Sequence, residues 1–395
     1  MTNTSTSAQT STLASTKEIL TCLVAFESLS ALSNLDMIAY IEGYLKEHGI
    51  SSSISYDETG ERANLYATVG PEADGGVVLN GHTDVVPVKG QPWTENPFTL
   101  IERNNRLYGR GSVDMKGFLA CTLAMVPAFK SYDLKRPMHL SFCYDEEIGG
   151  FGAPVLAEDI MSKAITPSVV IVGEPTNMQL VTGHKAGFEL RTEFDGLEVH
   201  SSDPRKGVNA VEFAARFISK ILEVGAKLAA SPVEGSPFEP PYSTCNVGQI
   251  EGGIATNITA KSCAINWEIR PIPGDDGYAI LDKIRNFADN VLVPEMQAVF
   301  PDANIRTLVL ADIPPLLALD DSPAVTLIRQ VTGSNVSEVV SFGTDAGYFE
   351  KVGLSTVVFG PGSIEQAHKP DEYIEISELE RCLSFLHDLA KHQAQ

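Results

Sequence analysis

The segment VVLNGHTDVVPV, residues 77–88, places a histidine and an aspartate two positions apart at the end of an apolar run. Because alternate residues of an extended chain point to the same side, we expect His82 and Asp84 to lie together where a strand ends. A metal-binding imidazole usually donates its second ring proton to a carboxylate or a carbonyl, so Asp84 could orient His82. Alone, the pair fits a polar strand end equally well, so it indicates a metal site only together with further ligands.

Other apolar runs of strand length also precede acidic residues or a histidine. They are LSFCY, VVIV and TVVFG, which begin at positions 140, 169 and 356. Taken singly, the polar residues fit ordinary roles, such as a helix N-cap, a turn acid or an exposed loop histidine. Because ligands of open α/β sheets bind outside the carboxyl ends of the strands, their recurrence predicts one shared metal site. The candidate ligands are His82, Asp114, Glu147, Glu174 and His368, with Glu146 beside them.

The charge of this candidate set indicates how many ions it would hold. Asp114, Glu147 and Glu174 carry three negative charges, and the two imidazoles are neutral. Two divalent cations leave a net charge of +1, which a bridging hydroxide cancels, whereas one cation leaves −1. Uncompensated buried charge is costly, so we expect two metal ions that share one carboxylate. Mixed imidazole and carboxylate ligands suit zinc, and cobalt and manganese are the alternatives.

Two neighbouring glutamates, Glu146 and Glu147, would need different roles. Neighbours in an extended chain face opposite directions, so one could bind metal while the other holds a proton. A metal lowers the pKa of bound water to ~7, and a nearby carboxylate can accept the proton and pass it to a leaving nitrogen. This pattern favours hydrolysis of an amide by a metal-bound hydroxide.

Composition and charge limit the kinds of molecule that the protein can bind. The 395 residues include 29 Lys and Arg against 51 Asp and Glu, and the net charge of −22 opposes binding to nucleic acid or to acidic membranes. Six cysteines without a CxxC pair indicate a reducing compartment. We find no signal peptide and no membrane-spanning run, and we therefore expect a cytoplasmic protein that acts on a small molecule.

The order of apolar patterns predicts an α/β fold with an insertion. Residues 1–15 read as a polar, disordered tail, and residues 16–48 as a helix that stops before Gly49. Alternating strands and helices then predict a mainly parallel sheet flanked by helices. Between 187 and 312 the pattern changes to β-α-β-β-α-β, which is ferredoxin-like. We expect a metal-binding catalytic domain over 16–186 and 313–395, and an inserted α+β domain over 187–312.

The motifs that carry these residues resemble a known family. GHTDVVPV, YGRGSVDMKG, DEEIGG, GEPT, HSSDPRKGVNA and GPGSIEQAHKPDEYIE occur in the order found in the two-zinc metallohydrolases that include acetylornithine deacetylase, succinyl-diaminopimelate desuccinylase, aminoacylase and carboxypeptidase. The last two motifs look most like the acetylornithine deacetylase branch. The resemblance implies that His82 and Glu174 bind one zinc, Glu147 and His368 bind the other, Asp114 bridges them, Asp84 orients His82, and Glu146 is the general acid/base.

The same resemblance assigns roles to the inserted domain. In the family this domain closes over the cleft and mediates dimerisation, so we expect a homodimer. His200 matches the histidine that stabilises the oxyanion in the partner subunit's site, a contribution often worth ~3 kcal/mol. Asn257 and Arg270 match positions that hold the substrate, and Asp345 is a further candidate for a substrate contact. The bulky residues of LEVHSS, where small ones are commoner, and the long Ser/Thr-rich start depart from the family pattern.

The resemblance implies hydrolysis of N2-acetyl-L-ornithine to L-ornithine and acetate, the deacetylation step of arginine biosynthesis. The nearest alternative is a related hydrolase of N-acyl amino acids, succinyl-diaminopimelate or short peptides, since the catalytic residues do not distinguish these substrates. A dinucleotide-binding oxidoreductase is disfavoured because GRGSVD breaks the GxGxxG pattern. A non-catalytic metal-binding or scaffold protein is disfavoured because Glu146 and His200 are both present.

Overall fold

The computed structural model describes residues 3–395 and divides them into two compact units. The first unit runs to Gly183 and also contains Leu316–Val339 and Thr344–Gln395. The second unit contains His184–Pro315 and Val340–Gly343. Among the described residues, no helix has the length and apolar character needed to cross a membrane.

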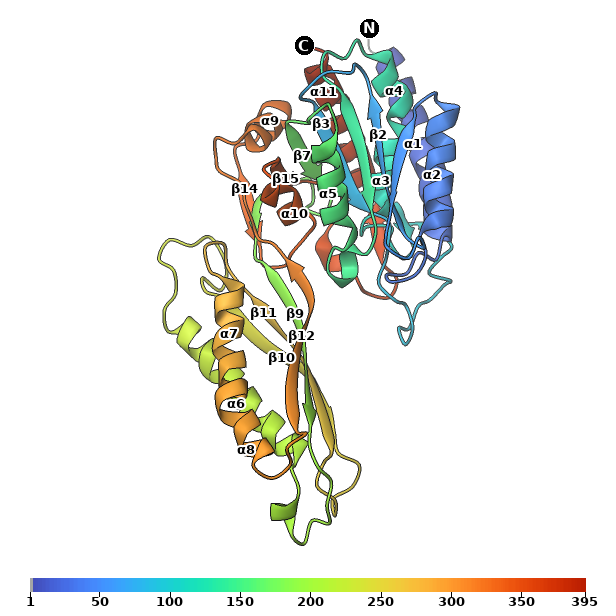
Figure 1. Ribbon diagram of the computed structural model, residues 1–395. Helices are drawn as coiled ribbons and strands as arrows, with labels where there is room; N and C mark the ends of the chain where they lie inside the picture. The colour runs from blue at the N-terminus through green and yellow to red at the C-terminus, as the bar shows by residue number, and fades with distance from the viewer. Residues whose placement is uncertain (1–2) are drawn as a thin grey trace. The chain divides into compact units, whose positions relative to one another are not determined.

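The first unit is organised around a mainly parallel sheet (Figure 1). Its central strands lie in the order β6-β3-β7-β15, and each pairs with its neighbour in parallel. The expected fold class is therefore confirmed. In the described part of the chain, nine strands form this sheet, in the order β1-β2-β6-β3-β7-β15-β8-β13 with β14 beside β8. Their bounds are β1 (Ser52–Tyr56), β2 (Ala63–Val69), β3 (Val77–His82), β6 (Met138–Cys143), β7 (Val169–Val172), β8 (Leu180–His184), β13 (Leu316–Leu317), β14 (Ser337–Val340) and β15 (Ser355–Val358).

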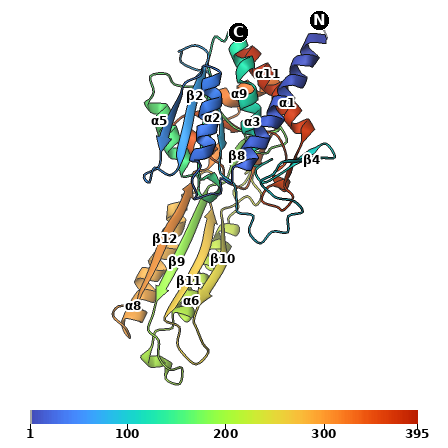
Figure 2. The ribbon, with the colours of Figure 1, turned by 90° about the vertical axis from the view of Figure 1, so that its right-hand side faces the viewer.

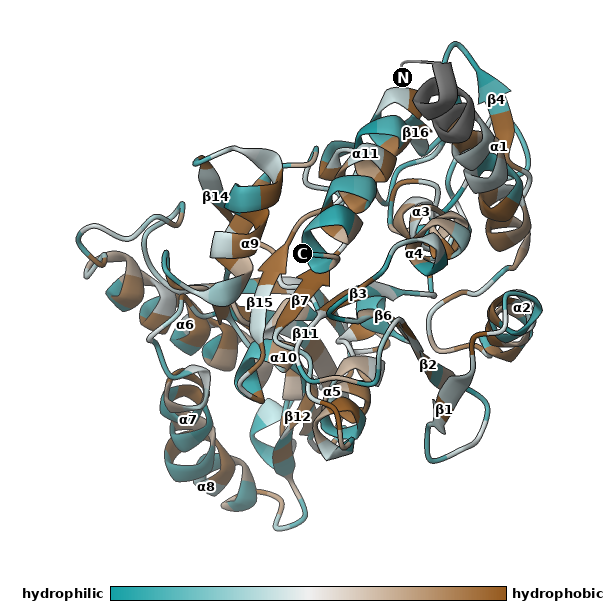
Figure 3. Cartoon of the chain, turned by 90° about the horizontal axis from the view of Figure 1, so that it is seen from above, coloured by the Kyte–Doolittle hydropathy of each residue, from teal (hydrophilic) through white to brown (hydrophobic). Residues whose placement is uncertain are grey.

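Helices cover this sheet on both faces, as Figure 3 shows from above. Leu79 and Ile171 belong to the main apolar core, whereas Val78 and Val170 point the other way and are also fully buried. Burial of both faces explains why the central strands appear in the sequence as continuous apolar runs. The helices are α1 (Asn3–Ala25), α2 (Leu35–Glu47), α3 (Lys116–Ala124), α4 (Val126–Ser131), α5 (Gly152–Ser162), α9 (Pro323–Thr332), α10 (Ala346–Lys351) and α11 (Ile376–Gln393).

The start of the chain differs from its prediction. The structure has two helices, α1 and α2, where a tail over 1–15 and one helix over 16–48 were expected; residues 1–2 lie outside the described part. No Gly or Pro interrupts α1, and a helix extends readily once packing has formed its later turns. The break follows from tertiary pairing, because Val85 N–H donates to Ser28 O at 2.9 Å and Ser30 N–H donates to Val85 O at 3.2 Å. The expected stop is correct, since α2 ends before Gly49.

A smaller sheet carries the loop that contains His368. It consists of β4 (Ile101–Arg103), β5 (Arg106–Tyr108) and β16 (Tyr373–Glu375), in the order β16-β5-β4. Antiparallel pairing places Tyr373 opposite Tyr108 and Glu375 opposite Arg106. The segment that precedes α3 is thereby joined to the segment that precedes α11, although the two are far apart in the sequence.

The second unit is a four-stranded antiparallel sheet backed by helices, which Figure 2 shows with the strands side by side. The strand order is β10-β11-β9-β12, and the chain order is the expected ferredoxin-like β-α-β-β-α-β. The first and last strands, β9 and β12, are neighbours in the sheet, and Gly187 lies opposite Ile313. The elements are β9 (Gly187–Asp195), α6 (Ala210–Ala229), β10 (Thr244–Gly252), β11 (Ser262–Arg270), α7 (Gly277–Phe287), a π-helical turn (Ala288–Leu292), α8 (Val293–Gln297) and β12 (Asn304–Ile313).

A buried histidine in β6 should make the first unit sensitive to acid. Burial lowers the pKa of His139 from 6.5 to about 4, and its Nδ1 lies 2.9 Å from Thr68 Oγ1. Below pH 6.5 the unfolded chain gains a proton that the folded chain excludes, so stability falls with pH until about pH 4. The wild-type protein should therefore lose unfolding free energy between pH 7.5 and 5.0. In the variant His139→Gln we expect this loss to be smaller by on the order of 2 kcal/mol.

Urea unfolding of chelator-treated wild type and variant at both pH values measures this difference. His200→Gln, the same substitution at an exposed imidazole, provides the control. Equal pH dependence in wild type and His139→Gln would show that His139 does not contribute.

Candidate metal centre

The five candidate ligands converge at the carboxyl ends of adjacent parallel strands. Each oxygen of the Asp114 carboxylate faces one imidazole: Oδ1 lies 3.1 Å from His82 Nε2, and Oδ2 lies 3.2 Å from His368 Nε2. On the first side, Glu174 Oε1 is 3.7 Å from His82 Nε2. On the second side, Glu147 Oε2 is 2.9 Å from His368 Nε2. Asp114 therefore lies between two histidine and glutamate pairs.

The sheet and the glycines beside it fix the first pair. His82 is the last residue of β3 and is fully enclosed, and its Nδ1–H donates to the backbone carbonyl of Asp84 at 2.9 Å. This bond occupies Nδ1 and leaves Nε2, which faces Asp114 and Glu174, as the nitrogen available for metal ligation. Glu174 follows Gly173, where an added Cβ would lie 2.1 Å from the ring of Phe118. Glycine at 173 thus lets α3 approach the backbone next to Glu174.

The Asp84 carboxylate has contacts beyond His82, the residue that the sequence suggested it orients. Its Oδ1 is 3.5 Å from His82 Nδ1, so the shorter bond to the histidine comes from the backbone carbonyl of Asp84. The two carboxylate oxygens accept the backbone N–H groups of Glu146 at 3.0 Å and Glu147 at 3.3 Å. Ser30 Oγ also donates to Asp84, at 2.8 Å. Asp84 therefore holds the backbone of both glutamates in place.

Glu146 and Glu147 do not face opposite directions, and that expectation is wrong. After β6 the chain turns at Asp145, whose φ of 55° is left-handed, and enters a short 3-10 helix over Glu146–Ile148. Asp145 is held in this conformation by an ion pair with Arg62 and by the N–H of Ala31 at 2.7 Å. Helical rather than extended geometry turns both glutamates toward the cluster, where ligand atoms of His82, Glu146 and Glu174 lie within 4.8 Å of one another.

The pKa values of the cluster reflect the close approach of several carboxylates. Burial, followed by repulsion from Asp114, raises the pKa of Glu147 to about 7. Burial raises the pKa of Glu174 and of Glu146 well above their usual values, and neighbouring carboxylates add to both shifts. Bonds to Asp114 and Glu147 raise the pKa of His368 to about 10. Such a cluster attracts cations, because bound cations would relieve the repulsion that protons now relieve.

The residues fit divalent cations on two further grounds. Glu174 Oε1 is buried and accepts no hydrogen bond, which leaves a costly unpaired acceptor aimed at the cluster. A second group of ligand atoms, from His82, Asp114 and Glu147, also lies within 4.8 Å of one another. Imidazole nitrogen and carboxylate oxygen are the ligand types that zinc and its neighbours bind.

Asp345 lies beside the cluster but is enclosed. The residue is 2% exposed, and Cys143 Sγ donates to Oδ2 at 2.7 Å. Burial raises the pKa of Asp345 to about 6, and its charge adds to the rise in the pKa of Glu146. The Asp345 charge therefore acts on Glu146, and its role as a substrate contact stays a prediction.

The remaining candidates lie in the second unit. His200 and Asn257 are both exposed and neighbour each other, since Ser201 N–H donates to Asn257 O at 3.0 Å. His200 Nδ1 accepts the N–H of Ser202 at 3.2 Å, so the neutral ring carries its proton on Nε2. Arg270 is paired with Glu268, with 2.8 Å between Nη2 and Oε2.

Two charged residues of the first unit escaped the sequence analysis. Arg110 and Glu372 form an ion pair at 2.6 Å, and their side chains are 1% and 0% exposed. Both lie inside motifs that the resemblance had singled out, GRG before Asp114 and HKPDEY around His368. The position of each charged residue within such a motif could have marked it as functional. Nothing in the sequence, however, indicated that Arg110 and Glu372 pair with each other.

Comparison with known proteins identifies the family of this chain. A model of peptidase family M20/M25/M40 matches residues 78–392, which include all five candidate ligands. The chain belongs to this family. Within the M20/M25/M40 family, it is 34% identical over 365 residues to a curated acetylornithine deacetylase from Salmonella arizonae, a match that covers 91% of this chain and 92% of that one.

Solved structures show the same fold across the M20/M25/M40 family. An M20 family metallo-carboxypeptidase from Sulfolobus solfataricus has a TM-score of 0.77 at 20% identity and covers 96% of this chain and 99% of its own. A dinuclear metal-binding M20 peptidase from Bacillus subtilis has a TM-score of 0.60 at 15% identity, with 95% and 98% covered. The family match and the 34% identity to the deacetylase make this chain a metallohydrolase, and the solved structures show that it shares the fold of these peptidases.

Proposed function

We propose that this enzyme hydrolyses N2-acetyl-L-ornithine to L-ornithine and acetate, the deacetylation step of arginine biosynthesis. The observation that carries the proposal is the 34% identity, over nearly the whole length of both chains, to the acetylornithine deacetylase from Salmonella arizonae. The second candidate is a peptidase or another N-acyl-amino-acid hydrolase. The likeness to the Sulfolobus solfataricus metallo-carboxypeptidase supports it, because that chain shares the fold.

We further propose that two divalent cations bind here, with zinc the first choice and cobalt or manganese the alternatives. His82 and Glu174 would hold one, Glu147 and His368 the other, and Asp114 both. The two facing pairs on either side of Asp114 support this division. The name of the dinuclear Bacillus subtilis peptidase supports the number of ions. Bound cations would polarise the acyl carbonyl and increase the acidity of a nearby water molecule.

Glu146 is the proposed general acid/base. Burial, followed by repulsion from Glu174, raises its pKa well above the usual range, the direction that strengthens a carboxylate as a proton acceptor. It would take the proton of the attacking water and deliver it to the departing α-amine as the amide bond breaks. Asp84 supports this role by fixing the backbone of Glu146.

The second unit is proposed to complete the site through a homodimer, in which His200 serves the partner subunit. The Nε2–H of His200 would donate to the developing oxyanion, and the bond from Ser202 to Nδ1 supports that tautomer. Asn257 and Arg270 would hold the substrate, with Arg270 suited to its carboxylate. We place the enzyme in the cytoplasm, and the six free thiols fit a reducing compartment.

The test of the proposed function is a substrate comparison. Chelated enzyme reloaded with zinc is assayed for release of free amine from N2-acetyl-L-ornithine, N-acetyl-L-methionine, succinyl-diaminopimelate and a dipeptide. We expect kcat/KM to be at least about 100-fold higher for acetylornithine, because a site that pairs polar groups with the side-chain amine rejects substrates that leave those groups unpaired. Preference for another substrate would overturn the deacetylase assignment and leave the metallohydrolase chemistry intact.

A further inference from the structure

A buried arginine links the segments that carry two of the proposed metal ligands. Arg110 Nη1 donates to Glu372 Oε2 at 2.6 Å, and Arg110 Nη2 donates to Gln91 Oε1 at 2.7 Å. The planar guanidinium thus bonds two different side chains in a fixed fork, whereas the ammonium of a lysine lacks that rigid planar geometry. Its ring neighbour is Trp93, with the guanidinium carbon 5.1 Å from the ring centroid.

The first arm of this network ends on the backbone of Asp114. Glu372 Oε1, the oxygen that does not face Arg110, accepts the N–H of Val113 at 3.0 Å and the N–H of Asp114 at 3.2 Å. A carboxylate that accepts two adjacent N–H groups fixes the orientation of that peptide segment. The Asp114 side chain therefore projects from a backbone that Glu372 and Arg110 hold in place.

The second arm ends on the backbone of His368. Gln91 Nε2 donates to His368 O at 2.9 Å, while Gln91 Oε1 accepts from both Arg110 and Trp93 Nε1. His368 needs such support, because it is half-exposed and has a left-handed φ of 62°. One guanidinium is thereby connected to the ligand proposed to bridge both ions and to the histidine proposed for one of them.

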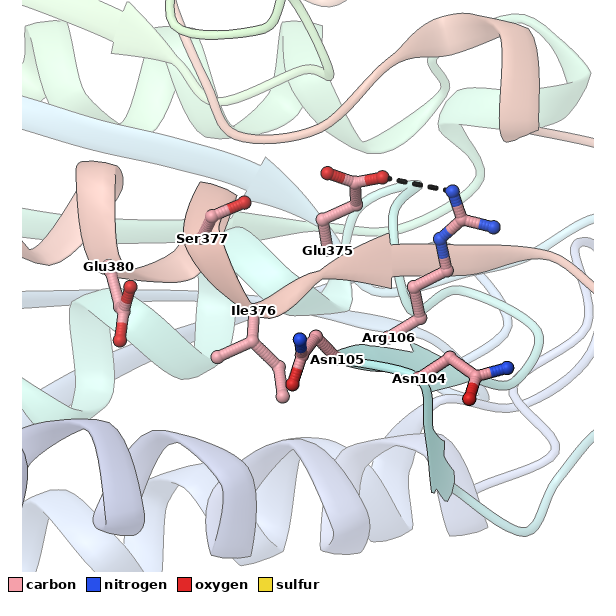
Figure 4. A pocket seen from close by; sticks show the side chains of 7 residues that line it. All are labelled: Asn104, Asn105, Arg106, Glu375, Ile376, Ser377 and Glu380. Atoms are coloured by element: carbon pink, nitrogen blue, oxygen red, sulfur yellow. Dashed lines mark hydrogen bonds and ion pairs between the residues drawn. The ribbon is translucent and has the colours of Figure 1, made fainter.

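A purely structural role explains the buried Arg110–Glu372 pair less well than a role in positioning the candidate metal ligands. Burying two charges is expensive, and an apolar pair of similar volume is often as stable. The same two segments are already joined by the pairing of β5 with β16 and by the surface ion pair between Arg106 and Glu375, at 3.1 Å, which Figure 4 shows. The buried pair is not required merely to connect the segments. What distinguishes it is the contact of Glu372 with the backbone of Asp114 and the link from Arg110 through Gln91 to the backbone of His368.

We propose that Arg110 is a positioning residue that sets the separation of the two metal positions, through Glu372 to Asp114 and through Gln91 to His368. The proposal rests on the proposed two-ion site but is independent of the substrate. Loss of both Arg110 hydrogen bonds should weaken binding of both ions. Loss of the Gln91 contacts alone should weaken binding of only the ion held by Glu147 and His368. Supporting contacts of this kind typically change metal affinity by about 10- to 100-fold.

The test titrates metal directly onto chelated protein. Zinc titration by calorimetry and the visible absorption of cobalt-loaded protein are recorded for wild type, Arg110→Met, Arg110→Lys, Gln91→Leu and the control Arg106→Met. We expect Arg110→Met to weaken both binding steps by about 10-fold or more, and Gln91→Leu to weaken one step only. Arg110→Lys should resemble Gln91→Leu, because it keeps the charge beside Glu372 but lacks the second arm. Arg106→Met, which removes the exposed pair of the same strands, should titrate as wild type.

Two wild-type binding steps in Arg110→Met with unchanged affinities and cobalt spectrum would overturn the proposal. If Arg110→Met fails to fold, Gln91→Leu decides, since it leaves the buried ion pair intact; two normal steps in that variant would also overturn it. A wild type that binds fewer than two ions would refute both the two-ion site and this inference. A wild type that binds two ions but does not hydrolyse acetylornithine would refute only the substrate assignment.

Discussion

Glu146→Gln should lower kcat by about 1,000-fold or more and leave both metal ions bound, because a positioned general acid/base contributes ~10²–10⁴ in rate. The amide has nearly the same shape as the carboxyl group but cannot accept the proton of water. Both kcat and metal content are measured on protein reloaded after chelation. The matched variant is Glu147→Gln, which alters the neighbouring residue of the same 3-10 turn and should lose an ion.

This experiment also decides between two roles for Glu146. Its carboxylate lies within ligand distance of His82 and Glu174, so the geometry alone would permit it to bind a metal. Loss of an ion from Glu146→Gln would make Glu146 a ligand and contradict the proposed division of labour. Near-normal turnover with both ions present would refute its role as the general acid/base.

Asp114→Ala should have the largest effect on metal content. Its two oxygens face His82 and His368 at 3.1 and 3.2 Å, so one substitution removes a ligand from both proposed positions. The remaining carboxylates would no longer neutralise the charge of two divalent cations, and we expect at most one ion per chain and background activity. Metal content after dialysis against zinc, together with the rate of acetylornithine hydrolysis, provides the measurement.

The control for Asp114→Ala is Asp345→Asn, which removes charge from a second buried carboxylate near the cluster. Because Asp345 faces Cys143 rather than the histidines, this variant should keep both ions. Two tightly bound ions in Asp114→Ala would refute the bridging assignment. Loss of ions from Asp345→Asn instead would place Asp345 among the ligands.

The four central strands of the sheet, β6, β3, β7 and β15, could be predicted because they are buried on both faces. Runs such as VVIV need no alternation to be recognised as strands, and the parallel order followed from the helical patterns between them. The break after Ala25 could not be predicted, because Ser28 and Ser30 bond to Val85, a contact that helical periodicity does not contain. The pairing of β5 with β16 was missed for the same reason, since each strand has three residues and the partner is distant.

The candidate ligands were easier to find than the residues that support them. Each ligand is near the end of a recognisable strand or the start of a helix, so position alone indicated convergence. Arg110 and Glu372 are separated by 262 positions, and only the folded chain brings them together. The predicted orientation of Glu146 and Glu147 was wrong because one left-handed residue, Asp145, converts an extended segment into a helical turn. Local backbone geometry of that kind is set by tertiary contacts, here those of Arg62 and Ala31.

The adjacency of β9 and β12 has a consequence for how this architecture can change. The strand that begins the second sheet and the strand that ends it lie next to each other, with Gly187 opposite Ile313. The ends of a 9-residue and a 10-residue strand that pair in this way are close enough to be joined by a short turn. The ferredoxin-like segment 187–313 therefore leaves the first unit and returns to it at neighbouring positions. One genetic event could add, delete or exchange this segment without reordering the strands that carry the candidate ligands.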